Sequence, residues 1–183
     1  MNREQAIDIL FEYTKSDALR KHAFAVEVCM LAYAEKFNEE NEEWSVTAIL
    51  HDFDYEMYPT APEHPKKGAE ILAEKGVSEK IRRAILGHAS YTDVPRDTLL
   101  AKSLFACDEL AGFITAVALV RPNKTVEEVE VKSVLKKMKD KAFARNVSRE
   151  DIILGADEIG IKLDDHIQFC IDAMRKNKEL LRL

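Results

Sequence analysis

The sequence is poor in the residues that cross-link a chain or interrupt its regular structure. It has 3 cysteines, 6 glycines and 5 prolines among 183 residues. Cys29, Cys107 and Cys170 are odd in number, widely spaced and flanked by apolar residues. This pattern is typical of reduced core thiols and argues against a disulfide framework or a thiolate zinc site. No Ser/Gly-rich linker, internal repeat or low-complexity stretch divides the chain, so we expect one domain over residues 1–183.

Long apolar runs and a leader-like start are also missing. The longest apolar run, Phe113 to Val120, is too short to cross a bilayer. Met1 to Leu10 lack the basic start and apolar core of a signal peptide. These absences predict a cytoplasmic protein without a membrane partner.

An excess of positive charge is absent as well. Lys and Arg total 27 against 33 Asp and Glu, which gives a formal net charge of −6. Long nucleic acids and anionic membranes are bound through many cations that neutralise phosphates, so we expect neither as a partner. A small phosphorylated substrate remains compatible with this charge, and the oligomeric state stays open.

The residues that are present predict helices. Hydrophobic residues make up 46% of the chain and charged residues 33%, as in an ordinary globular protein. Apolar residues recur at helical spacing, for example at Leu19, Ala23, Val26 and Met30, and no segment shows sustained apolar/polar alternation. We therefore predict an all-α fold of about eight helices.

Capping and stop residues predict the helix boundaries. One helix is expected from Trp44 to Met57, ended by the prolines that follow it. Other helices are expected to start after N-caps at Ser16, Ser78 and Asp97, and at capping boxes formed by Thr125 with Glu128 and by Ser148 with Asp151.

Histidines cluster in the first half of the chain, which has four of the five. His51 and Asp52 are adjacent in the predicted helix, where side chains about 100° apart can grip one ion from two sides. Imidazole and carboxylate are the usual protein ligands of Fe, Mn and Zn. His22 shares the apolar stripe of its helix, and Asp108 lies among apolar residues where a buried acid needs a partner. Each alone is explained by a core histidine, a cap or a surface charge, but the ordered set indicates a metal site.

This order of ligands resembles the HD-domain superfamily of metal-dependent phosphohydrolases. The resemblance spans about Leu19 to Leu110, within a motif core of about residues 16–121 that a helical extension, 122–183, follows. It implies one or two divalent ions, of Fe, Mn, Mg, Zn or Ni, and a catalytic role for His51 and Asp52. Two-metal branches add histidines between the His-Asp pair and the last Asp, and His64 and His88 match those positions. The full implied ligand set is His22, His51, Asp52, His64, His88 and Asp108.

Two departures limit the resemblance. The HD-GYP branch has paired histidines followed by Asp-Gly and Gly-Tyr-Pro, whereas here a single histidine precedes residues 91–95, Tyr-Thr-Asp-Val-Pro. Hydrolysis of cyclic dinucleotides is therefore not expected. Many HD enzymes have a lysine three residues after the Asp of the pair, where this chain has Tyr55.

The resemblance implies hydrolysis of a phosphoester in a small nucleotide-like metabolite. Asp52 would bridge two ions that activate a shared water to hydroxide, and the ions would also neutralise charge on the phosphoryl oxygens. Further cations could bind the substrate phosphate. The candidates near the motifs are Lys66, Lys67, Arg82 and Arg121, and a basic stretch beyond them offers Lys132, Lys136, Lys139, Lys141 and Arg145.

Two other functions remain open from the sequence. A few HD-like proteins are di-iron oxygenases that use the same six ligands to activate dioxygen. A non-catalytic ligand-binding module would keep the helical scaffold, although a complete ligand set argues against it. His166 has no place in the motif and is interpreted as a structural or surface residue.

Overall fold

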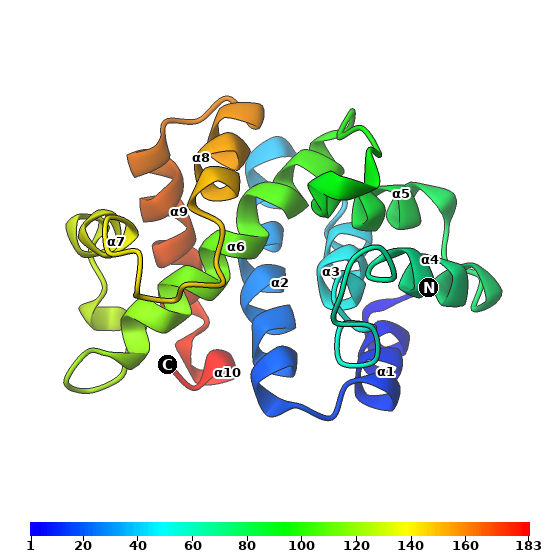
Figure 1. Cartoon of the computed structure of the whole chain (residues 1–183), viewed down its shortest axis with the longest axis horizontal. Coiled ribbons are helices and arrows are strands. Elements are labelled where there is room, and N and C mark those ends of the chain that lie inside the picture. Colours follow the sequence, from blue (N-terminus) through cyan, green and yellow to red (C-terminus); the bar gives the residue numbers. More distant parts are fainter.

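A computed structural model describes all 183 residues, and it confirms the all-α prediction, with ten α-helices and no β-strand (Figure 1). Two short 3-10 turns, Ser90–Thr92 and Val126–Glu128, join some of them. The helices are α1 (Arg3–Tyr13), α2 (Asp17–Phe37), α3 (Asn41–Leu50), α4 (Lys66–Glu74), α5 (Glu79–His88), α6 (Leu99–Leu119), α7 (Val131–Met138), α8 (Arg149–Glu158), α9 (Leu163–Lys176) and α10 (Lys178–Leu181).

The helix count exceeds the expected number of about eight because α1 and the four-residue α10 were not predicted. α1 begins at a capping box, in which the Asn2 side chain accepts from the Gln5 amide and the Gln5 side chain accepts from the Asn2 amide. Three predicted N-caps are confirmed, since the hydroxyls of Ser16, Ser78 and Ser148 each accept an amide of the following first turn. These bonds satisfy amides that a helix N-terminus leaves without a partner.

The predicted N-cap at Asp97 is wrong, whereas Thr125 is an N-cap whose hydroxyl accepts the Glu127 amide but which forms no capping box. The N-cap of α6 is Thr98, whose hydroxyl accepts the Ala101 amide at 3.2 Å, while Asp97 instead pairs with Arg83. Thr125 starts a 3-10 turn and not a capping box with Glu128. The Glu128 carboxylate accepts from the backbone and side-chain amides of Asn123, which precedes the turn.

The predicted helix from Trp44 to Met57 ends early, at Leu50, and residues 51–57 form turns. His51 is the C-cap of α3, and its ring Nδ1 donates to the Ala48 carbonyl at 2.7 Å. That bond satisfies one of the carbonyls that a helix C-terminus leaves free. The His-Asp pair therefore lies at a helix end, from which the chain turns back across the molecule towards α4.

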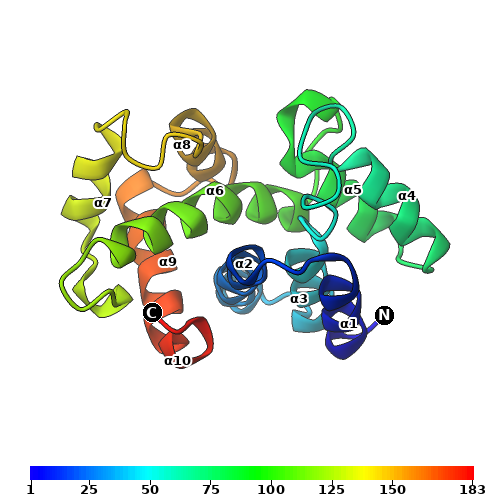
Figure 2. The ribbon, with the colours of Figure 1, turned by 60° about the horizontal axis from the view of Figure 1, so that its bottom comes forward.

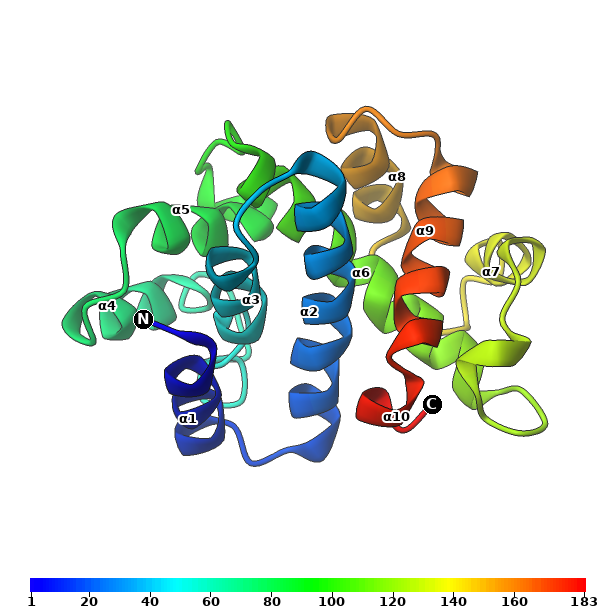
Figure 3. The same cartoon turned by 180° about the vertical axis from the view of Figure 1, so that it is seen from behind.

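The two longest helices, α2 and α6, form the centre of the fold and have 21 residues each. α6 runs across the molecule with α2 and α3 on one side and α8 on the other (Figure 2). Seen from behind, α9 lies beside α2 and α1 beside α3 (Figure 3). Side chains from α1 to α10 share one core, whose largest fully buried members include Trp44, Tyr33 and Phe113.

α8 approaches α6 unusually closely at Gly155. A Cβ atom there would lie 2.6 Å from the Cα of Ala106, which no larger residue could accommodate without a shift. This contact lies two residues before Asp108 on α6 and sets α8 against the helix that provides that carboxylate. No helix of the chain combines the length and apolar character that a membrane span requires.

Candidate metal centre

All six sequence-predicted ligands come together where α2, α3, α5 and α6 meet. They form two groups whose ligand atoms lie within 4.8 Å of one another, and both groups contain Asp52. The first group is His22, His51, Asp52 and Asp108, and the second is Asp52, His64 and His88.

The first group joins side chains from α2, from the middle of α6 and from the C-terminal end of α3. His22 Nε2 of α2 lies 2.9 Å from Asp108 Oδ1 of α6 and 3.2 Å from His51 Nε2 at the end of α3. Asp52 Oδ2 lies 3.6 Å from His51 Nε2. The His22 ring lies beside Gly112, one turn after Asp108, at 3.6 Å from the position of an added Cβ, which is an ordinary contact distance.

The second group faces the other oxygen of the same carboxylate. Asp52 Oδ1 lies 3.2 Å from His64 Nε2 and 3.4 Å from His88 Nε2. The two Nε2 atoms are 3.3 Å apart. Asp52 thus presents one oxygen to each group, which is the arrangement of a carboxylate that bridges two ions.

The hydrogen bonds of the imidazole rings indicate that a cation belongs between them. Nδ1 of His51 and Nδ1 of His88 face the carbonyls of Ala48 and Ile85, and these oxygens can only accept. Nδ1 of His64 faces the Asp54 carboxylate at 2.9 Å. Each Nδ1 therefore carries a proton, and in the neutral rings the lone pairs of Nε2 point at one another. A separation of 3.2–3.3 Å suits two nitrogens on one ion with bonds of about 2.1 Å.

Asp54 supports the second group and was missed in the sequence. Its side chain is fully buried, and it accepts from His64 Nδ1 and from the Gly68 amide at 3.0 Å. A Cβ at Gly68 would lie 2.6 Å from Asp54 Cγ, so only glycine fits there. Tyr91 adds a further constraint, since its hydroxyl donates to the His64 carbonyl at 2.6 Å. An acid two residues after Asp52, next to the buried Phe53, was the available signal.

The electrostatics of the group favour ionised carboxylates. Burial alone would raise the pKa of Asp52, but His51, His64 and His88 together hold it well below its usual range. His51 and His22 lower the pKa of Asp108 in the same way. Burial opposes charge on His64 too, yet its hydrogen bonds to Asp52 and Asp54 raise its pKa to about 9. The site thus holds positive charge strongly, and a divalent ion would take the place of these protons.

A pocket of about 420 Å³ opens onto the two ligand groups. Tyr55 and Tyr91 lie at its mouth and are 39% and 48% exposed. Burial and the adjacent Asp108 raise the pKa of Glu109, another lining residue, to about 8. The C-terminal part of the chain contributes a wall of this pocket, which consists of Asn146, Val147 and Asp151.

None of the predicted phosphate-binding cations lines this pocket, which contains no Lys or Arg. Lys67 pairs with Glu70, Lys132 with Glu130, and Arg82 donates to the Val77 carbonyl. Lys139 lines a separate hollow with Leu135, Met138 and Ile153. The others outside the lining are Lys66, Arg121, Lys136, Lys141 and Arg145.

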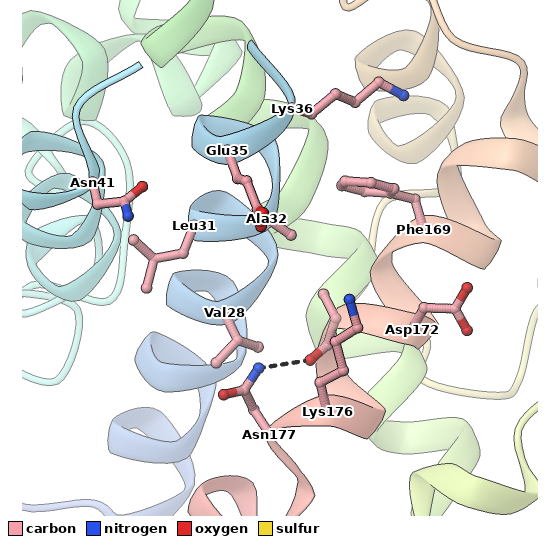
Figure 4. A pocket seen from close by; sticks show the side chains of 11 residues that line it. Val28, Leu31, Ala32, Glu35, Lys36, Asn41, Phe169, Asp172, Lys176 and Asn177 are labelled. Carbon is pink, nitrogen blue, oxygen red and sulfur yellow. Dashed lines mark hydrogen bonds between the residues drawn. The ribbon is translucent and has the colours of Figure 1, made fainter. Parts of the chain in front are cut away.

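A larger pocket, of about 650 Å³, lies away from the histidines between α2 and α9 (Figure 4). It is lined by Glu35, Lys36, Asp172 and Lys176 among apolar residues, and Lys36 Nζ lies 4.9 Å from the centre of the Phe169 ring. No group of potential metal ligands reaches it. The chemistry of the molecule therefore points to the smaller pocket.

His166 lies in the core, as one of the two sequence interpretations had it. It is fully buried, its Nε2 donates to the Ala106 carbonyl at 2.9 Å, and its Nδ1 accepts from the Tyr33 hydroxyl at 2.6 Å. Both ring nitrogens have protein partners. Burial, which disfavours the charged ring, lowers the pKa of His166 to about 4.

A comparison with protein families agrees with this geometry. The family model of the HD domain matches residues 19–112, which is just over half of the chain. This chain belongs to the HD-domain family. All six clustered His and Asp residues lie inside the matched range, whereas Asn146, Val147 and Asp151 of the pocket wall lie outside it. No curated protein and no solved structure matches the chain.

Proposed function

We propose that the chain is a metal-dependent phosphohydrolase that cleaves a phosphoester of a small nucleotide-like metabolite. The observation that carries the proposal is Asp52, which turns one oxygen to each of two ligand groups at the base of an open pocket. Divalent ions bound there would supply the positive charge that stabilises a phosphoryl group and the activation of a water for attack.

The residues of the chain would hold and orient these ions. The rings of His51, His64 and His88 are fixed through Nδ1, so that each Nε2 faces the site. Fixed ligands lower the cost of reorganisation during reaction, because the site is already arranged for the charge that develops. His22 and Asp108 complete the group nearer α6.

The mouth of the pocket supports a nucleotide-like substrate. Tyr55 and Tyr91 are both aromatic, both line the pocket and both are partly exposed. The Tyr55 ring meets the His64 ring edge to face, at 5.2 Å between centroids. Exposed aromatic rings at a pocket mouth offer faces on which a planar base can stack.

The test starts with metal analysis of protein purified without chelator. Phosphate release is then measured over a panel of mononucleotides, dinucleotides and sugar phosphates, with Mn, Fe, Mg or Ni added. We expect release that depends on the metal and is absent from chelated protein and from Asp52→Ala. No metal-dependent release from any member would contradict the proposal, and oxygen consumption on a phosphonate or polyol with iron bound would identify an oxygenase instead.

A further inference from the structure

The metal pocket has two unlike halves. One half is the set of HD-domain ligands, and the other is a wall that lies outside the family match. That wall contributes Asn146 and Asp151, and Glu109 of α6 lines the same pocket. Because the wall lines the same pocket as the cluster without belonging to it, a substrate whose phosphate lies at the cluster can reach the wall with the rest of the molecule.

The wall is built into the fold. Arg149 folds the preceding loop around its guanidinium, which donates to the carbonyls of Ala144 and Val147 at 2.7 and 2.6 Å and also to that of Phe143. The same guanidinium lies 4.7 Å from the centre of the Phe113 ring of α6. Asn146 therefore lies between backbone carbonyls that Arg149 holds, and Asp151 follows in the first turn of α8, where its amide bonds to the Ser148 hydroxyl.

The side chains of this wall are free to bind a ligand. The hydroxyl of Ser148 caps the Asp151 amide at 3.1 Å, but the Asp151 carboxylate and the Asn146 side-chain amide make no hydrogen bond or ion pair within the chain. A carboxylate accepts hydrogen bonds only, and an amide can accept or donate. Hydroxyl or amino groups of a ligand would satisfy both.

The charges of the pocket limit how much phosphate it can take. Two divalent ions would carry four positive charges, of which Asp52, Asp108 and an activated hydroxide would neutralise three. One phosphate monoester, whose charge is close to −2 at neutral pH, already more than compensates the remainder. A second phosphate would lie near Asp151 without a Lys or Arg in the pocket lining to compensate it.

We infer that the substrate carries a single phosphate group and presents hydroxyl or amino hydrogen-bond donors to Asn146 and Asp151. This inference rests on the proposed phosphohydrolase function and narrows its substrate class. The same wall excludes substrates with two or three phosphates, because their additional negative charge would lie near Asp151.

Binding of two analogues tests the inference without turnover. Adenosine 5′-monophosphate and 5′-triphosphate, each with the 5′ ester oxygen replaced by methylene, are titrated calorimetrically into metal-loaded protein. We expect the monophosphate analogue to bind at least tenfold more tightly. Equal or tighter binding of the triphosphate analogue would overturn the inference.

Three variants locate the effect. Asp151→Ala should weaken the monophosphate analogue about tenfold with metal content unchanged, and Asp151→Lys should reduce the preference over the triphosphate analogue. Arg145→Gln is the matched control, because Arg145 is exposed next to Asn146 but does not line the pocket. A loss of triphosphate binding in Arg145→Gln, or unchanged binding in Asp151→Ala, would contradict the assignment of the wall.

Metal-dependent turnover of p-nitrophenyl phosphate by the wild-type protein separates this inference from the proposed function. Turnover with a preference for the triphosphate analogue would refute the single-phosphate inference alone. No turnover of this ester or of the metabolite panel would refute the phosphohydrolase itself.

Discussion

Four histidines surround Asp52, whereas the fifth, His166, lies in the core between α6 and α9, and the two environments use the ring differently. His51 and His166 are both fully buried. Both nitrogens of His166 are bonded within the protein, but His51 uses only Nδ1 in that way and turns Nε2 to other ligands. The kind of partner, and not burial, separates the structural histidine from the candidate ligand: both nitrogens of His166 face neutral groups, whereas Nε2 of His51 faces an imidazole and carboxylates.

The pKa values of the histidines in the two environments differ as well. Burial lowers the pKa of His166 to about 4, since no carboxylate faces it. His64 is also buried, but Asp52 and Asp54 raise its pKa to about 9. One ring is kept neutral by the core, and the other is placed where positive charge is stabilised.

The largest expected effect comes from Asp52, because both ligand groups depend on it. Asp52→Ala should reduce bound metal to less than about a tenth of the wild-type content and abolish metal-dependent turnover. Metal content is measured by mass spectrometry after purification without chelator. Asp164→Ala, at an exposed position in the first turn of α9, is the control that should keep both. Wild-type metal content in Asp52→Ala would show that the cluster is not a metal site.

The next largest effect should differ between the two ligand groups of the cluster. His64→Ala and His88→Ala are each expected to reduce metal content towards half, since they belong to one group only. His22→Ala should remove the other ion. Anomalous scattering from crystals soaked in Mn would show which peak is lost in each variant. A single peak in the wild type, distant from His64 and His88, would leave a site for one ion.

A smaller effect is expected from Gly68→Ala, which alters the support of His64. The added methyl would push Asp54 away and reduce occupancy of the His64 group, at a cost of about 1–3 kcal/mol in the free energy of unfolding. Urea unfolding and metal analysis measure the two effects. Gly76→Ala is the control, because its φ of +77° makes the substitution strained while no atom lies near the added Cβ. Gly76→Ala should lower the free energy of unfolding and keep the metal. Loss of metal in both variants would show that the support of His64 by Asp54 is not what holds the metal.

The smallest effect concerns the core histidine and pH. The pKa of His166 is about 4 in the folded chain and about 6.5 when unfolded, so the unfolded state binds the extra proton between these values. The neutral His166 therefore contributes fully to the free energy of unfolding above pH 6.5. About 2 kcal/mol of that free energy should be lost between pH 7 and pH 5. Urea unfolding of chelated protein should show a shallower pH dependence in His166→Gln than in the wild type. If the free energies of unfolding of the two proteins depended on pH in the same way, His166 would not be the source of this pH dependence.

The sequence was sufficient to predict the ligand cluster, because a His-Asp pair and its distant partners in apolar surroundings can be recognised from their order along the chain. It was not sufficient for the end of α3. The apolar residues continue at helical spacing through Phe53, and the bond from His51 to Ala48 leaves no local sequence signal. Asp54 left only one signal, an acid next to the apolar Phe53, and its role became evident only from the contact with the later Gly68.

The predicted phosphate-binding cations lie outside the lining of the metal pocket for a different reason. Lys67, near a motif, and Lys132, beyond the motifs, are long, exposed side chains that pair with nearby glutamates, and their positions in the sequence did not indicate this. The residues that do form its far wall come from beyond α7 and reach the site through the packing of α8 on α6. Such long-range packing has no periodic signature in the chain.

The way Arg149 holds its loop bears on how this pocket could change over time. Its guanidinium bonds to backbone carbonyls, which every amino acid provides, and not to particular side chains. Exposed positions of this loop, such as Asn146, can therefore exchange side chains while the loop keeps its path. Random substitution at position 146 with Arg149 retained is thus a route to altered substrate choice on an unchanged metal-binding scaffold.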